Sequence, residues 1–359
     1  MFLTIAIFIT LLGVLVLVHE WGHFVVARRF GVRVEEFAFG FPPRLLSITR
    51  RGTRYALNLI PIGGYVKIFG ETGEAEKNPA SFSSRPLSQR LAIIAAGVAM
   101  NVVLAWVLFS LGHGLGLPTV LDEGETGAGA AVTVIGVAPQ SPASEAGLMF
   151  GDVIEKLEAG SRGLEITQIG EVQTFVDERR GQEIRLLVRR GKERVELAAT
   201  PRSSPPEGEG ALGIAMARIG VVRAPWWRAP WDGFKTTANA ALAITRALGR
   251  AVGDLFTRGQ LPTDVSGPVG IFAFADESRR LGLTYVIELA GILSVNLALL
   301  NILPIPALDG GRALFLFIEG LSGGIKVNQR LEQAVHTVGF AVLLLIMAAI
   351  TYRDVMRIL

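Results

Sequence analysis

The sequence predicts an α-helical polytopic membrane protein with four transmembrane helices, a membrane-associated β-hairpin and an inserted α+β domain. Hydrophobic residues make up 50% of the 359 residues, whereas charged residues make up only 19%, below the roughly 25% of an ordinary soluble domain. Surface that faces lipid instead of water accounts for this deficit of charge. A polar insertion of domain size, from about 114 to 283, interrupts the apolar sequence.

Four stretches approach the roughly 20 apolar residues that cross a bilayer. They lie near residues 2–27, 91–112, 284–303 and 334–352. The first is predicted to be a retained helix, because no Lys or Arg precedes its apolar run and no small-residue cleavage pattern ends it. The connection after it, from 28 to 90, holds eleven basic and five acidic residues. By the positive-inside rule this connection is cytoplasmic, so the polar insertion and both termini are extracytoplasmic.

The composition excludes several classes of function. Basic and acidic residues number 35 and 32, and the arginines are scattered instead of gathered on one helix or arm, so nucleic-acid binding has no support. Cysteine is absent, which excludes disulfides, thiolate metal sites and a cysteine nucleophile. Any metal must therefore bind to His, Asp or Glu side chains.

The chain divides into four predicted parts. Residues 1–112 hold the first two spans, 113–204 the exported domain, 205–283 a linker and an amphipathic region, and 284–359 the last two spans. In the exported domain, short alternating apolar runs predict strands around one or two short helices. Pro201–Gly210 is rich in Pro, Ser, Glu and Gly and is predicted to be a linker.

Tryptophans introduce the amphipathic region. Trp226, Trp227 and Trp231 precede an amphipathic stretch at 231–256, which is predicted to lie at the membrane surface or against the spans. A fifth crossing is disfavoured, because charged residues interrupt this stretch.

The end of the first span carries the pattern H-E-x-x-H. His19 and His23 are four residues apart, so both lie on one face of a helix and can reach one metal ion, with Glu20 available as a general base. The alternative is a helix end with incidental polar residues. An ionisable residue in hydrocarbon costs at least about 2.5 to 3.5 kcal/mol on insertion scales, which favours a compensating Zn²⁺.

A third ligand is expected far along the chain, since catalytic zinc usually has three protein ligands. After the third span, Pro304 and Pro306 break the helix before Asp309, which lies near the same cytoplasmic side. The alternative is that Asp309 caps the next helix. Co-occurrence with the histidine pair favours the ligand.

Together these motifs resemble the site-2 protease family of intramembrane zinc metalloproteases, in its bacterial RseP-like branch. Gly97–Asn101 is similar to the family's G-x-x-x-N, Asn301–Gly310 to its N-x-x-P-x-P-x-L-D-G, and Ser266–Gly270 to a segment before the third span. The resemblance covers nearly the whole chain. It implies the same roles as the residue chemistry, with His19, His23 and Asp309 holding zinc and Glu20 acting as general base.

The resemblance also implies substrate-binding roles for Asn101 and Asn301. An amide can hydrogen-bond an extended substrate backbone or a developing oxyanion. A hydrogen bond between spans is the alternative for both. His113 and His336 match nothing in the motifs and are predicted to be packed or interfacial.

Residues 55–69 read as a β-hairpin with two strand-like arms around Pro61–Gly64. The segment is too apolar for an isolated cytoplasmic hairpin, so it is predicted to dip into the membrane beside the active site, as the similar family segment does. Its free edge, including Gly63, Gly64, Tyr65 and Val66, could pair with an unwound substrate as an extra strand. The alternative is a structural hairpin that closes the bundle.

The exported domain resembles a PDZ domain. Ser141–Leu148 and Gly151–Ile154 are similar to the S-P-A-x-x-A-G-L-x-x-G-D-x-I of protease-associated PDZ modules. Such a domain binds peptides or acts as a bulky filter over the active site, and we favour the filter. Many members of the branch have two such domains, whereas this chain has room for one, with 158–167 as an apparent insertion.

The resemblance implies a zinc-dependent intramembrane endopeptidase in the bacterial cytoplasmic (inner) membrane. Its partners would be membrane lipid and single-span substrates, such as anti-sigma factors or remnant signal peptides, cleaved in regulated intramembrane proteolysis. Two alternatives remain: a membrane-bound zincin acting on non-membrane peptides, and a catalytically silent PDZ membrane adaptor. The sequence leaves the oligomeric state open.

Overall fold

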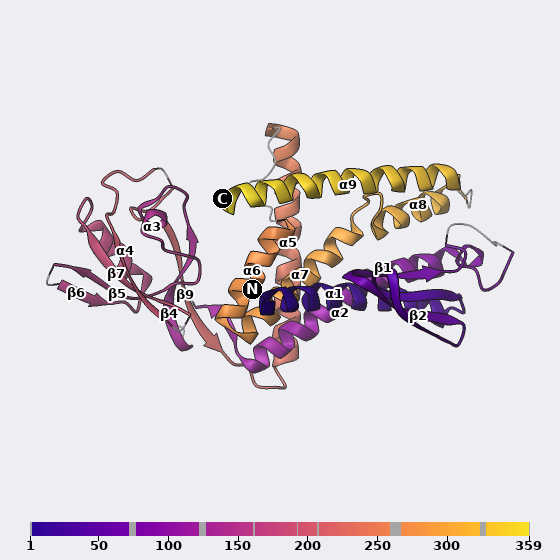
Figure 1. Ribbon diagram of the computed structural model, residues 1–359, viewed down its shortest axis with the longest axis horizontal. Coiled ribbons are helices and arrows are strands. Elements are labelled where there is room, and N and C mark those ends of the chain that lie inside the picture. Colours follow the sequence, from indigo (N-terminus) through magenta and orange to yellow (C-terminus); the bar gives the residue numbers. More distant parts are fainter. Residues whose placement is uncertain are drawn as a thin grey trace. The chain divides into compact units, whose positions relative to one another are not determined.

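The computed structural model describes residues 2–71, 77–121, 127–160, 162–191, 193–206, 208–258, 267–323 and 328–358. The chain forms two compact units, which are described separately (Figure 1). The membrane unit comprises Met1–Leu111, Trp227–Asp276 and Val286–Leu359, and the second unit comprises Gly112–Trp226 and Glu277–Tyr285. Ser266, the first residue of the predicted Ser266–Gly270 motif, lies outside the described residues.

Within the described ranges, four helices are long and apolar enough to cross a membrane, which confirms the predicted number of spans. They are α1 (Phe2–Arg29), α2 (Leu87–Leu115), α7 (Leu283–Ile302) and α9 (Gln329–Ile358). The other helical elements near them are η1 (Phe82–Ser84), α5 (Ala229–Arg258), α6 (Pro268–Leu281) and α8 (Asp309–Leu321).

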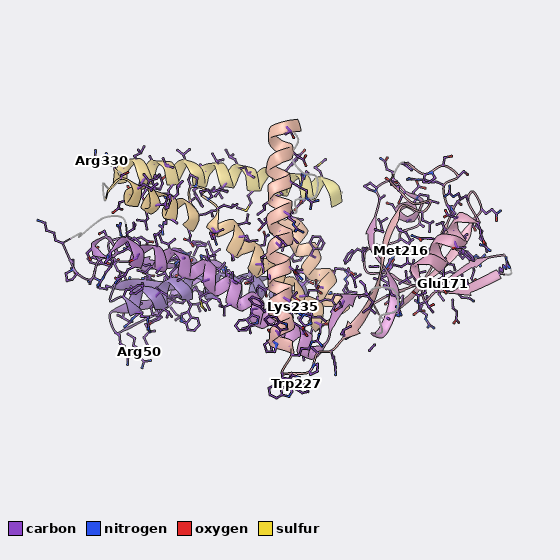
Figure 2. The ribbon with its side chains drawn as sticks, turned by 180° about the vertical axis from the view of Figure 1, so that it is seen from behind. Arg50, Glu171, Met216, Trp227, Lys235 and Arg330 are labelled. Atoms are coloured by element: carbon purple, nitrogen blue, oxygen red, sulfur yellow. The ribbon has the colours of Figure 1, made fainter. Side chains whose placement is uncertain are left out.

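The predicted amphipathic stretch is part of α5, which packs against the spans. Ala240, Ala241 and Ile244 of α5 contact a buried cluster formed by Phe109 of α2 and Val295 of α7 with their neighbours. Trp227 and Lys235 are labelled near the beginning of α5 in Figure 2. α5 is not among the four apolar helices of the described chain.

Strands β1 (Val34–Arg50) and β2 (Thr53–Ile68) form the sheet of the membrane unit. Both strands bend, and their register contains three antiparallel ladders. Residues 44–50 pair with 53–58, residues 36–41 pair with 54–60, and residues 34–39 pair with 64–68. The sheet therefore has four segments, with 44–50 and 64–68 at its two edges.

The predicted hairpin at 55–69 is wrong in its pairing. The arms do not pair with each other, because the first segment of β1 lies between them. Phe37, for example, pairs with Tyr55 on one side and with Val66 on the other. The pairing partner of each arm comes from an earlier part of the chain, which the local pattern of 55–69 does not contain.

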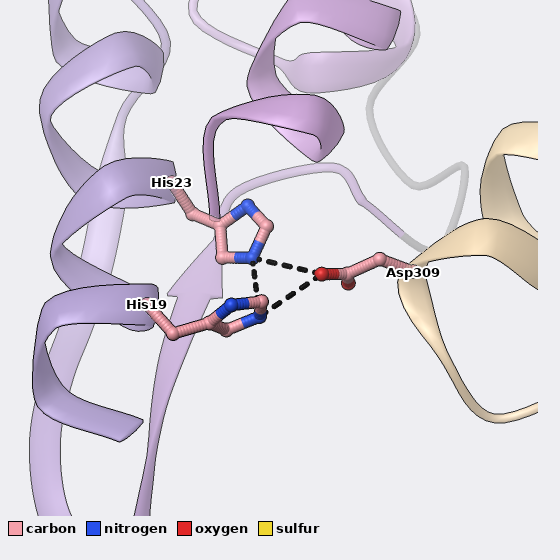
Figure 3. A group of neighbouring side chains, drawn as sticks. All are labelled: His19, His23 and Asp309. Carbon is pink, nitrogen blue, oxygen red and sulfur yellow. Dashed lines mark hydrogen bonds and ion pairs between the residues drawn. The ribbon is translucent and has the colours of Figure 1, made fainter. Parts of the chain in front are cut away.

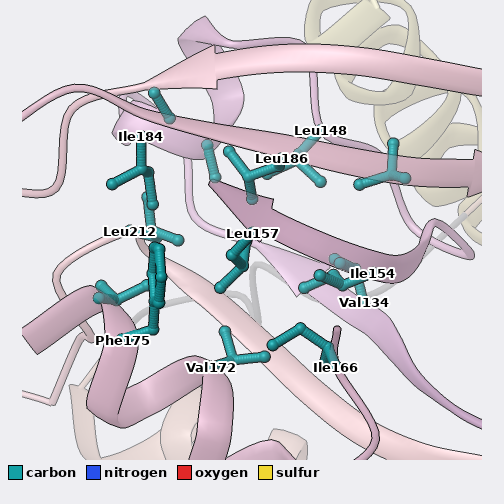
Figure 4. Packing of buried hydrophobic residues seen from close by; sticks show 14 of the residues in the cluster. Val134, Leu148, Ile154, Leu157, Ile166, Val172, Phe175, Ile184, Leu186 and Leu212 are labelled. Atoms are coloured by element: carbon teal, nitrogen blue, oxygen red, sulfur yellow. The ribbon is translucent and has the colours of Figure 1, made fainter. Parts of the chain in front are cut away.

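The second unit holds a sheet in the order β3-β9-β4-β5-β7-β8, with β6 paired to β5. Its strands are β3 (Leu117–Val120), β4 (Ala128–Val137), β5 (Val153–Ala159), β6 (Arg162–Glu165), β7 (Ile184–Arg190), β8 (Glu193–Ala199) and β9 (Ile214–Val222). Two short helices, α3 (Pro142–Glu145) and α4 (Ile169–Asp177), accompany the sheet, as predicted. An apolar core that includes Leu157, Val172 and Leu186 lies between α4 and the strands (Figure 4).

The second unit extends beyond the predicted boundary at residue 204. β9 follows this boundary, yet it pairs with β4 from Ala128↔Val221 to Val137↔Ile214. Pro201–Gly210 is consequently a connection within the unit and not a linker between domains. In the stretch 158–167, predicted as an insertion, β6 pairs with β5 and is exposed along its length.

Candidate metal centre

Three side chains from two distant parts of the chain converge in the membrane unit (Figure 3). His19 and His23 lie one turn apart on α1 and are both buried, and Asp309 is the first residue of α8. Oδ2 of Asp309 lies 3.0 Å from Nε2 of His19 and 3.2 Å from Nε2 of His23, and the two Nε2 atoms are 3.2 Å apart. The structure thus brings together the three predicted metal ligands.

These distances fit zinc. Tetrahedral zinc with ligand bonds of about 2.0–2.1 Å places neighbouring ligand atoms roughly 3.3 Å apart. Nδ1 of His23 lies 2.8 Å from the Ile93 carbonyl oxygen, which can only accept, so Nδ1 carries the proton and Nε2 presents its lone pair to the centre. Two imidazole nitrogens and one carboxylate oxygen are a donor set that suits Zn²⁺.

The segment before α8 has a backbone that requires glycine after the aspartate. A Cβ on Gly310 would lie under 3.0 Å from the Leu303 carbonyl oxygen, and a Cβ on Gly311 would lie under 3.0 Å from the Ile305 carbonyl oxygen. Small residues therefore let the chain fold back on itself after the two prolines. This fold-back is what brings Asp309 to the histidines.

α8 is fixed by two ion pairs. Arg90 of α2 donates two hydrogen bonds to Glu319, at 3.0 and 2.6 Å, and both side chains are buried. Arg312 forms an ion pair with Glu71. Their geometry holds the helix that carries Asp309 against the rest of the unit.

His336 contributes a support that the sequence analysis did not identify. The Ala307 N–H donates to Nδ1 of His336 at 2.8 Å, and Ala307 has a φ of +76°, in the left-handed region. His336 is outside the three-ligand group, in agreement with its predicted role as a packed residue. It stabilises a strained backbone two residues before Asp309. A histidine near the beginning of an apolar span was the signal for it.

Charges around Asp309 favour its ionised form. Burial raises the pKa of this carboxyl, but positive charge on the side of the carboxyl that faces His19 and His23 outweighs burial, and the pKa lies well below its usual range. Arg312 lies three residues after Asp309, and the negative charge of Glu71 raises the pKa of its guanidinium. An ionised carboxylate is the form that binds a metal cation.

Glu20 lies beside the centre, on the same helix as the two histidines. Its carboxylate accepts a hydrogen bond from the backbone N–H of Val66, in the edge segment 64–68 of the sheet. The edge segment and the metal centre are consequently neighbours. Tyr65 points its hydroxyl elsewhere, to Glu36 at 3.1 Å.

The remaining predicted site residues differ in burial and in their contacts. Asn101 of α2 is fully buried, with Nδ2 3.3 Å from Nδ1 of His19. Asn301 is half-buried in the last turn of α7. Gly63 has a φ of +91° where β2 bends, and Gly64 pairs with Phe39.

Comparison with known proteins agrees with this geometry. The family model described as Peptidase family M50 matches residues 7–346. The chain belongs to peptidase family M50. M50 relatives include a protein of Clostridium acetobutylicum named as a candidate zinc metalloprotease, which is 32% identical over 99% of this chain and 98% of its own length.

Two further M50 relatives carry the name RasP. Zinc metalloprotease RasP of Shouchella clausii is 30% identical, and regulator of sigma-W protease RasP of Bacillus subtilis is 28% identical, each over 99% of both chains. This chain is thus a zinc metalloprotease of the site-2 type and a multi-pass protein of the inner membrane.

Proposed function

We propose that this M50 protease cleaves the transmembrane segments of single-span membrane proteins, with His19, His23 and Asp309 as zinc ligands and Glu20 as general base. The convergence of three ligand atoms at 3.0–3.2 Å, two of them on a helix apolar enough to cross a membrane, carries the proposal. When bound, zinc supplies Lewis-acid chemistry and activates water for attack on a peptide carbonyl. The protein's own residues supply orientation and proton transfer.

Glu20 is the residue that accepts and returns the proton. It lies on α1 between the two histidines in sequence, and Val66 N–H fixes one side of its carboxylate. A carboxylate held in this way can take a proton from water and later deliver it to the leaving amine. A Gln side chain at this position keeps the volume but cannot accept the proton.

The substrate binds as an additional strand on the edge segment 64–68. Phe69 N–H donates to the Arg33 carbonyl, towards β1, while Val66 N–H points to Glu20, away from β1. Backbone groups alternate in direction along a strand, so Gly64 and Ile68 direct their N–H and C=O groups to the same side as Val66. Within the described sheet no strand pairs with that side. A substrate helix must unwind to use it.

Cross-linking tests the strand. The chain has no cysteine, so Lys67→Cys introduces one thiol into the edge segment and Ile48→Cys one into the opposite edge. In a Glu20→Gln background, a substrate with single cysteines along its span is expected to cross-link to Lys67→Cys with a period of two. Ile48→Cys is the matched control and is expected to give no periodic pattern. Equal cross-linking at both edges would argue against strand addition.

The substrate class follows from the membrane setting and the relatives. The name of the Bacillus subtilis relative describes a regulator of a sigma factor, which favours membrane-bound anti-sigma factors, with remnant signal peptides as a second group. Membrane peptides that accumulate with Glu20→Gln but not with the wild-type protein identify the substrates. Accumulation of soluble peptides only would support a zincin acting outside the membrane, and no difference would support a silent adaptor.

The second unit is proposed to be a single extracytoplasmic PDZ domain that excludes bulky substrates. Its support is the S-P-A segment, in which Ser141 caps α3 through a hydrogen bond from Ser144 N–H, and the nearby Gly-Asp turn. Single cysteines at Glu193 and Arg50 test the orientation with a membrane-impermeant maleimide. Glu193→Cys is expected to react in intact cells, whereas Arg50→Cys reacts only after lysis. The reverse result would invert the topology, including that of both termini.

A further inference from the structure

A stripe of three residues on α2 faces the histidines of α1. Ile93, Gly97 and Asn101 are four residues apart, the same spacing as His19 and His23. Ile93 offers its carbonyl to His23, and Asn101 offers its amide to His19. α1 and α2 run antiparallel here, and residues four apart lie on one face of each helix, so each histidine of α1 faces one residue of the α2 stripe.

Gly97 makes this approach possible. A Cβ at this position would lie under 3.0 Å from ring atoms of both histidines. Gly22 does the same on α1, because its Cβ would strike the Ala96 carbonyl oxygen. The two helices therefore touch closely enough for α2 groups to hydrogen-bond the far side of each imidazole ring.

The amide of Asn101 has one unsatisfied group. Its Oδ1 is buried and has no hydrogen-bond partner, while Nδ2 lies 3.3 Å from Nδ1 of His19. Oxygen and nitrogen of an amide are interchanged by a half-turn of the side chain, and the hydrogen-bond network decides the assignment. With the half-turn, Oδ1 accepts from His19 Nδ1–H and Nδ2 takes the position that has no partner, so the assignment depends on the His19 tautomer. A metal ligand needs its lone pair on Nε2, which places the proton on Nδ1 and favours the half-turn.

We propose that Asn101 is a positioning residue of the metal centre, which fixes the tautomer and ring orientation of His19 through Oδ1. The proton then sits on Nδ1, and Nε2 presents its lone pair to the metal. Ile93 already imposes the same tautomer on His23. Outer partners of this kind orient metal-bound histidines in many metalloproteins. The inference rests on the proposed metal ligands.

The location of Asn101 argues against direct contact with substrate. Its side chain has 0% exposure, and its own backbone carbonyl accepts a hydrogen bond of 2.8 Å from Ser294 Oγ of α7, which is also fully buried. A neighbouring helix therefore holds this turn of α2 in place. Asn301, by contrast, is half-buried and stays the better candidate for substrate binding.

Zinc affinity of the purified full-length protein, measured by competition with a chelator in detergent, tests the inference. Asn101→Leu keeps the approximate volume but cannot accept a hydrogen bond, and it is expected to weaken zinc binding about 10- to 100-fold. Asn101→Asp retains an acceptor and is expected to stay within about threefold of the wild type, because a carboxylate serves the same role. Asn296→Leu, at a half-buried amide of α7, is the matched control and is expected to leave affinity unchanged.

The results distinguish the positioning role of Asn101 from the proposed set of metal ligands. Wild-type zinc affinity in Asn101→Leu would overturn the positioning role, as would an Asn101→Asp variant as weak as Asn101→Leu. Retained affinity in Asn101→Asp also shows that the fold tolerates substitution at this buried position. Full zinc binding by Asp309→Ala would instead overturn the proposed ligand set, so the two failures are distinguishable.

Discussion

The two units bury different kinds of residue. Among the described residues, the core of the second unit is a continuous apolar cluster, whereas the membrane unit buries His19, Asn101, Arg90 and Glu319. In lipid the outward face of a helix is apolar, so polar groups gain by turning inward, where they find partners. In a domain surrounded by water, apolar side chains turn inward and charged side chains face the solvent. Polar substitutions in the membrane unit should therefore affect function, and apolar substitutions in the second unit should affect stability.

Buried charge in the second unit follows a different rule from that in the membrane unit. Asp152 is fully buried, but it pairs with the partly exposed Arg190 at 2.7 Å and accepts from Met149 N–H. This pair closes a turn. Asp152 does not belong to the group of possible metal ligands found among the described residues. The membrane unit instead uses its buried charges to hold α8 and Asp309. The contrast separates charges that support a fold from charges that support a site.

The largest expected effect comes from the site itself. Asp309→Ala removes one of three proposed ligands and leaves two imidazoles facing an empty position. Zinc affinity should fall by more than the roughly 10- to 100-fold expected of an outer partner, and cleavage should fall with it. Metal analysis of the purified variant checks this. Full zinc stoichiometry would mean that the third ligand lies elsewhere and that Asp309 only caps α8.

Breaking the buried ion pair should come next. Glu319→Met leaves Arg90 buried without its partner, which costs about 3–5 kcal/mol in known cases. The thermal stability of the membrane unit and its zinc affinity should both decrease, since α8 carries Asp309. The double variant Arg90→Met with Glu319→Met is the control, because it leaves no charge unpaired and should be more stable than the single variant. A double variant as unstable as the single one would contradict this explanation.

In the second unit an apolar truncation should reduce stability without loss of chemistry. Leu157→Ala opens a cavity in the core of Figure 4, because Leu157 is completely buried, and should destabilise the unit by about 2–5 kcal/mol. Limited proteolysis of the full-length protein measures it. Zinc content and the cleavage of short, trimmed substrates should be unchanged. Exposed Leu164→Ala is the control, with an effect of about 0.5 kcal/mol or less.

The sequence predicts the four spans, and its histidine and aspartate motifs point to residues that do converge in the structure. Apolar length identifies a membrane helix without knowledge of its neighbours, and two histidines four apart share a face of any helix. The partner of Asn101 could not be assigned, because the choice between substrate and a neighbouring helix depends on packing. The contact between His336 and Ala307 is equally non-local.

Strand pairing shows the same limit. The alternation in 55–69 identifies strands, but their partner, the segment 34–41, carries a similar alternation and competes for both arms. Nearness in sequence favours a hairpin, yet in the structure the earlier strand occupies the space between the arms. β9 lies beyond the predicted end of its domain for a comparable reason, since its partner β4 is about 80 residues earlier.

The smallest expected effect concerns a helix cap at the surface of the second unit. Backbone N–H groups of Thr167 and Gln168 donate to the Glu171 carboxylate at the N-terminus of α4, which lowers the pKa of Glu171. Glu171 is labelled in Figure 2. Because the folded pKa is below the unfolded one, this stabilisation is present above the unfolded pKa, near 4.5, and is lost as the pH falls through the folded value.

Glu171→Gln should consequently destabilise the second unit by about 1 kcal/mol or less at pH 7, a loss that shrinks as the wild-type carboxylate becomes protonated below pH 4.5. Unfolding of the full-length protein, followed by limited proteolysis at a series of pH values, measures the difference. Glu183→Gln, outside the cap, is the control and should follow the wild type throughout. A constant difference between wild type and Glu171→Gln down to pH 3 would mean that the cap acts through shape and not through charge. The contrast between the two units would then rest on packing alone, because the negative charge of the cap would contribute nothing measurable to the stability of the second unit.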